Sequence, residues 1–76
     1  MKGRLNDILT DKTVVITELV RNKLTPKLMD MGLYPGKHLK VLFKAPFGDP
    51  IAIDVEGYVL SLRLEEAALI LVKADD

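Results

Sequence analysis

Three short segments in which apolar and polar residues alternate, joined by tight turn sequences, constrain the fold more than any other feature. They are residues 37–44, 51–56 and 58–63. The first two are separated by Ala-Pro-Phe-Gly-Asp-Pro (residues 45–50), and the last two meet at Glu56-Gly57. Alternation with a period of two is typical of strands with one buried face, and Pro, Gly and Asp favour sharp reversals of the chain. The region therefore predicts consecutive antiparallel strands.

Two further segments complete the predicted sheet. Residues 13–20 are rich in β-branched side chains and predict the first strand, and residues 69–72 predict the last. Between the first two strands, Thr25 is placed to cap a short helix, Pro26 suits its first position and Gly32 its end. A type II turn at residues 33–36 then leads into the second strand.

The length of 76 residues predicts one domain, residues 1–76, with a thin core built from aliphatic side chains. About five short strands with one short helix between the first two favour a mostly β fold. We expect a small, partly open barrel of the SH3-like kind, because curling the sheet protects its edges. Leu5 and Leu9 are expected in the core, and Asp75 and Asp76 at a frayed end.

The charges are balanced overall but not along the chain. Eleven Lys and Arg face eleven Asp and Glu, yet residues 1–44 hold nine basic against four acidic residues and residues 45–76 two against seven. Two interpretations remain open: basic and acidic strands pair within the fold, or a basic face docks a partner. The zero net charge argues against nucleic-acid binding, and so does the expectation that Phe43 points inward and leaves no aromatic side chain among the Lys residues.

A predicted register places a small amphipathic patch on the outer sheet face. If residues 45–50 keep Phe43 opposite Ile53, then Leu42 lies opposite Asp54, and Val59 lies beside Asp54 on the next strand. Leu42 and Val59 would flank a carboxylate, with two lysines nearby. We interpret this patch as a partner-binding surface, and ordinary scattered surface aliphatics are the alternative. Its predicted members are Leu42, Val59, Lys40, Lys44 and Asp54.

Catalytic and metal-binding signatures are missing from the sequence. His38 is the single histidine, cysteine is absent, and neither a nucleophile elbow nor a Gly-rich phosphate loop occurs. We therefore expect no enzyme and no cofactor. The possible metal ligands have no recognised spacing, so a transition metal site stays an open alternative without assigned ligands. Those possible ligands are His38, Asp49, Asp54, Glu56, Glu65 and Glu66.

The sequence lacks a stretch of roughly 20 apolar residues, so we expect a protein that does not itself span a membrane. The absence of cysteine suits a reducing compartment. Together these features predict a cytoplasmic location.

The segments DMGLYPG, APFGDPIAIDV and YVLSLRLEEAALILV together resemble the ferrous iron transport protein A (FeoA) family. The resemblance implies an SH3-like barrel and a small cytoplasmic accessory protein, not an enzyme. It would support a membrane ferrous iron transporter (FeoB-like) that carries a cytosolic G-domain. Similar barrels occur in metal-dependent transcription regulators, so a regulator-type interaction module or a nucleic-acid-binding barrel is the alternative. Weak self-association is a further possibility.

The corner of residues 45–50 has a predicted structural role. Pro46, Gly48 and Pro50 shape the reversal, and Asp49 is expected to accept hydrogen bonds from backbone N–H groups of the turn. Arg63 is expected to pair with Asp49. The chain departs from the family pattern at residues 11–12, where a glycine turn is common, and at residues 27–28, where Arg-Leu is common.

Overall fold

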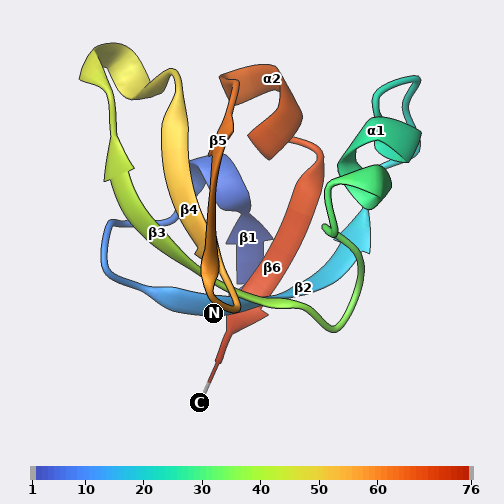
Figure 1. The fold of residues 1–76 in the computed structure, drawn as a ribbon, viewed down its shortest axis with the longest axis horizontal. Coiled ribbons are helices and arrows are strands. Elements are labelled where there is room, and N and C mark those ends of the chain that lie inside the picture. Colours follow the sequence, from blue (N-terminus) through green and yellow to red (C-terminus); the bar gives the residue numbers. More distant parts are fainter. Residues whose placement is uncertain (1, 76) are drawn as a thin grey trace.

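The computed structural model describes residues 2–75 and contains one curled antiparallel sheet (Figure 1). Six strands lie in the order β1-β6-β2-β3-β4-β5, with β1 and β5 as the two edges. The mostly β class and the partly open barrel are therefore confirmed. The strands are β1 (Lys2–Arg4), β2 (Thr13–Leu19), β3 (His38–Lys44), β4 (Ile51–Val55), β5 (Tyr58–Leu62) and β6 (Ile70–Ala74).

Two short α-helices and two 3₁₀ turns connect the strands. Helix α1 (Thr25–Asp30) follows β2, and α2 (Leu64–Ala67) joins β5 to β6. The 3₁₀ turns are η1 (Leu5–Asp7) and η2 (Pro46–Gly48). Five strands were predicted; the sixth, β1, pairs with β6, and its three residues are too few to show an alternating pattern.

The core is aliphatic. Among the described residues none of the four aromatic side chains is buried, and Leu, Ile and Val from every strand except β1 fill the interior. The largest fully buried side chains are those of Leu5, Ile16, Leu28, Leu33, Leu39, Ile51, Ile53, Leu62 and Ile70. The predicted aliphatic core is present, but its members differ at two places.

The first difference lies at the start of the chain, where Leu9 is 69% exposed and Ile8 is buried in its place. The Ile8 N–H donates to the Leu5 carbonyl (3.1 Å) at the end of a 3₁₀ turn. Because residues three apart eclipse one another in a 3₁₀ turn, Leu5 and Ile8 face the core together. The predicted α-helical spacing was therefore wrong here.

The second difference is a bulge in β3. Val41, and not Phe43 as predicted, lies opposite Ile53, while Phe43 lies opposite Ala52 and is 59% exposed. The extra residue at Leu42 reverses the alternation. The predicted pairs Phe43–Ile53 and Leu42–Asp54 were wrong, and Lys40 is the residue opposite Asp54.

The connections largely follow the predicted turn chemistry. Lys37 N donates to Tyr34 O (3.1 Å) across a turn whose Gly36 has a φ of 96°, as a type II turn requires. Glu56 and Gly57 both have positive φ and close a two-residue hairpin. Thr25 does not cap α1, because its hydroxyl donates to the Val20 carbonyl (2.7 Å).

The last described residue, Asp75, donates its N–H to Thr13 O (3.3 Å), so it is held by the sheet and not frayed. Asp76, for which fraying was also expected, lies outside the described residues.

Candidate functional site

The outer face of β3, β4 and β5 carries a row of three predicted patch residues. Lys40 lies opposite Asp54, and Asp54 lies opposite Val59. Val59 is 64% exposed, and Lys40 is exposed beside it. A cation, a carboxylate and an aliphatic side chain thus stand side by side across three strands.

The other two predicted members of the patch lie differently. Leu42 sits in the bulge and is half-buried, so it contributes less apolar surface than expected. Lys44 is half-buried because its Nζ donates to the Asn6 carbonyl (3.1 Å). Phe43, which was expected inside, joins the outer face instead. The sequence analysis missed it because nothing in the residue pattern marks the bulge.

The residues 45–50 form a compact corner at the end of β3. Ala45 N donates to Pro50 O (2.9 Å), and Gly48 N donates to Ala45 O (2.8 Å). Phe47 and Gly48 both have positive φ, of 66° and 76°. The Asp49–Pro50 peptide bond is cis.

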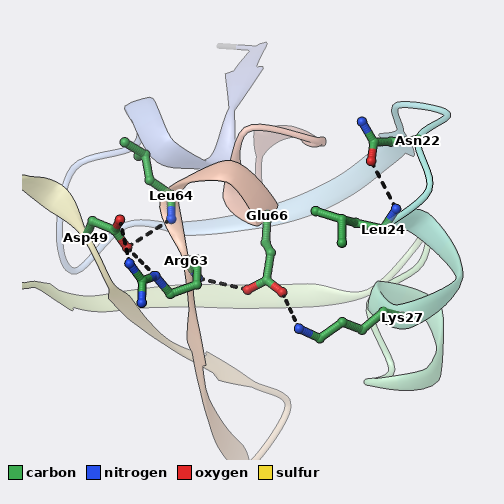
Figure 2. Close-up of polar contacts among 7 residues, drawn as sticks. All are labelled: Asn22, Leu24, Lys27, Asp49, Arg63, Leu64 and Glu66. Atoms are coloured by element: carbon green, nitrogen blue, oxygen red, sulfur yellow. Dashed lines mark hydrogen bonds and ion pairs between the residues drawn. The ribbon is translucent and has the colours of Figure 1, made fainter.

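Asp49 connects this corner to the start of α2 (Figure 2). Its carboxylate accepts from Arg63 Nε (3.0 Å) and Arg63 Nη2 (3.3 Å) in a bidentate ion pair, and from Leu64 N (3.1 Å). Leu64 is the first residue of α2, and the N-cap residue Arg63 has no side-chain acceptor of its own. Asp49 therefore supplies the missing helix cap from a distant part of the chain. The backbone N–H that it accepts from belongs to α2 and not, as expected, to its own turn.

Glu66 extends this network toward α1. Its side chain is 5% exposed, its Oε1 accepts from Arg63 N (2.9 Å), and its Oε2 lies 2.7 Å from Lys27 Nζ (Figure 2). The hydrogen bond from Lys27, aided by that from Arg63 N–H, lowers the pKa of this carboxyl below its usual value. Lys27, where an arginine is common in the family pattern, thus fastens α1 to α2.

Basic and acidic parts of the chain pair within this fold, which was one of the two predicted outcomes. Besides the Lys27–Glu66 pair, Lys37 Nζ lies 3.6 Å from Glu56 Oε1. Glu56 Oε2 also accepts from His38 N (3.0 Å), and this hydrogen bond is the main cause that lowers the pKa of Glu56.

The residues weighed as metal ligands are distributed over the surface. His38 Nδ1 lies 2.7 Å from Asp75 Oδ2, while Asp49 and Glu66 are occupied as described. Within residues 2–75, no three His, Asp or Glu side chains converge on a common point. Three of the weighed residues, His38, Asp54 and Glu56, line one shallow depression of about 260 Å³ together with Lys40. In the same part of the chain, no helix is long and apolar enough to cross a membrane.

Comparison with known proteins gives consistent results. The family model of the FeoA domain matches residues 3–74. An Fe(2+) transport protein A/Fe(2+) transporter FeoB fusion protein of Porphyromonas gingivalis is 34% identical over 71 residues, which are 92% of this chain. The chain spans only 8% of the length of that curated relative.

Solved structures show the same fold. The NMR structure of a FeoA-like protein from Clostridium acetobutylicum is 40% identical, with a TM-score of 0.89 over 96% of this chain and 86% of that one. The crystal structure of Stenotrophomonas maltophilia FeoA with zinc, described as an SH3 domain protein, is 20% identical. Its TM-score is 0.80 over 92% of this chain and 88% of that one. At that identity the likeness concerns the fold alone, and it shows that the barrel is SH3-like.

Proposed function

The chain belongs to the FeoA family, and from this membership we propose that it is a cytoplasmic accessory protein of ferrous iron uptake. In this proposal it docks on the cytosolic region of a membrane ferrous iron transporter with a G-domain, and performs no catalysis. The observation that carries the proposal is the fusion relative, in which a matching FeoA segment and FeoB are parts of one chain. Domains fused in one species are commonly separate partners in another.

The row formed by Lys40, Asp54 and Val59 suits a protein partner. Its charges are of both signs and its apolar surface is exposed, which is the mixed composition of transient protein interfaces. A nucleic-acid interface would instead require a strongly basic face with stacking aromatics. Phe43 adds an aromatic side chain to the same face of the sheet, beside Ala52. We assign the docking surface to these four residues, with Leu42 and Lys44 at its margin.

Docking changes transport only if the protein binds two states of the transporter with different affinity. A binding preference of about 1.4 kcal/mol for the active state would raise the ratio of active to inactive transporter tenfold.

A pull-down from detergent-solubilised membranes of the native cells tests the proposal. We expect the tagged protein to recover the ferrous iron transporter, and the Lys40→Glu/Val59→Asp variant to lose it. Lys73→Glu on β6 is the matched control, since β6 is separated from β3 by β2. If the wild-type protein does not recover the transporter, the proposal is contradicted. If Lys40→Glu/Val59→Asp recovers as much transporter as Lys73→Glu does, the docking surface lies elsewhere.

A further inference from the structure

Phe47 is fully exposed to solvent, and nothing in the fold requires its phenyl ring. The core takes no contribution from it, although this small protein has only four aromatic residues to stabilise its interior. Phe43, four residues earlier, is also more than half exposed. Phe43 and Phe47 are thus two large exposed apolar side chains within five residues of the chain, and contiguous exposed apolar surface marks interaction sites.

The backbone at Phe47 is unfavourable for a bulky residue. Its φ of 66° and ψ of 12° lie in the left-handed region, where glycine or asparagine would give the same turn without strain. Strained positions of this kind persist where the surroundings impose them, and they cluster at functional sites. The residue at position 47 is therefore not explained by the demands of the turn.

The corner presents this ring on a rigid base. The hydrogen bonds between Ala45 and Pro50 and between Gly48 and Ala45 close the loop, and the Asp49 carboxylate fixes it to α2. A phenyl side chain has only two rotatable bonds and so loses little conformational entropy on binding, and aromatic side chains are enriched at the centre of protein interfaces. We propose that Phe47 inserts into an apolar pocket on the cytosolic region of the ferrous iron transporter. This inference rests on the proposed function and names the residue that would contribute most to docking.

The charges around Phe47 favour a protein pocket over a lipid surface. Asp49 is the one charged residue among residues 45–50, and it is paired with Arg63. The Lys44 ammonium is directed to the Asn6 carbonyl. Residues 45–50 themselves hold no Lys or Arg, whereas anionic headgroups bind polybasic segments.

The position of the corner also agrees with the proposed docking surface. The corner directly follows β3, and Phe43 lies on the outer sheet face that carries Lys40, Asp54 and Val59. In the fusion relative, the matching segment shares one chain with the transporter, which makes the transporter the partner within reach. The anchor and the strand row would thus contact the same partner.

Binding of the purified full-length protein to the immobilised, detergent-solubilised transporter from the same genome tests the anchor. We expect Phe47→Gly to raise the Kd at least about 30-fold, the usual effect of removing an aromatic hot spot. Its thermal midpoint should stay within a few degrees of wild type, because glycine accepts the left-handed conformation. Met29→Gln is the matched control, since Met29 is 51% exposed on α1, and it should leave the Kd within about twofold.

Each other outcome overturns a different statement. If wild type binds and Phe47→Gly binds equally well, the anchor is wrong while the proposed function stands. If wild type itself does not bind, the proposed function fails first. If the protein sediments with vesicles of phosphatidylethanolamine and phosphatidylglycerol, and Phe47→Gly does not, the partner of Phe47 is lipid and not the transporter. If sedimentation velocity shows concentration-dependent dimers that Phe47→Gly abolishes, the partner is a second copy of the protein.

Discussion

Replacing the buried Glu66 should destabilise the fold, because this carboxylate caps the start of its own helix α2 and pairs with Lys27 of α1. Glu66→Ala removes the charged acceptor of the Arg63 N–H and the partner of Lys27. A hydrogen bond to a charged group contributes about 1.5–3 kcal/mol to the free energy of unfolding. The Lys27 side chain is 61% exposed, so solvent screens its pairing and about 0.5 kcal/mol is added. We expect a total loss of about 2–3.5 kcal/mol.

Urea unfolding followed by circular dichroism at neutral pH measures this loss. Glu66→Gln keeps a carbonyl oxygen for the Arg63 N–H and should lose only about 1 kcal/mol. Glu65→Ala is the matched control, because Glu65 is its exposed neighbour on the same helix and should stay within about 0.5 kcal/mol of wild type. A Glu66→Ala protein as stable as the Glu65→Ala protein would refute the argument that the Glu66 carboxylate stabilises the start of α2 and its contact with α1.

Three further changes follow from the same contacts. Asp49→Ala should lower the free energy of unfolding by about 1–2 kcal/mol, because the helix cap on Leu64 and the ion pair with Arg63 are lost, and Asp49→Asn should lower it by about half as much. An unchanged thermal midpoint together with lost transporter binding would instead make Asp49 a functional residue. The thermal midpoint of Gly32→Ala should be lower than that of Gly36→Ala. Both glycines have positive φ, but only at Gly32 does an added Cβ overlap the Tyr58 hydroxyl, so equal midpoints would contradict this packing. The folded-state pKa of Glu66 lies below its ordinary 4.5, so its contribution to the free energy of unfolding is complete above that pH and is lost as the pH falls through the lowered pKa. The free energy of unfolding should therefore fall less steeply with acid in Glu66→Gln than in wild type, and parallel curves for the two proteins would disprove this linkage.

The strands were predictable because their side chains alternate in a sheet with one buried face. Residues 13–19, 38–44, 51–55 and 58–62 all fall in predicted strands, and the turns before His38 and after Val55 have the chemistry that their glycines indicated. Local sequence determines these features, since period and turn geometry depend on neighbouring residues.

The bulge in β3 was not predictable, and it changed the candidate surface. One extra residue exchanged Leu42 for Phe43 on the outer face, and period-two patterns carry no mark of such an insertion. The pairing of Arg63 with Asp49 was expected from charge, whereas the cap on Leu64 was not. That cap depends on where the fold brings two loops together, which only the tertiary structure determines.

We propose that the outer face of β3 to β5 and the corner at Phe47 dock on the transporter. NMR titration of the isotope-labelled protein with the transporter's purified cytosolic domain tests it most directly. We expect the amide signals of the non-proline residues in 45–50 and of Lys40, Asp54 and Val59 to shift or broaden first. Perturbations confined to α1, or to the β1 and β6 edge of the sheet, would contradict it.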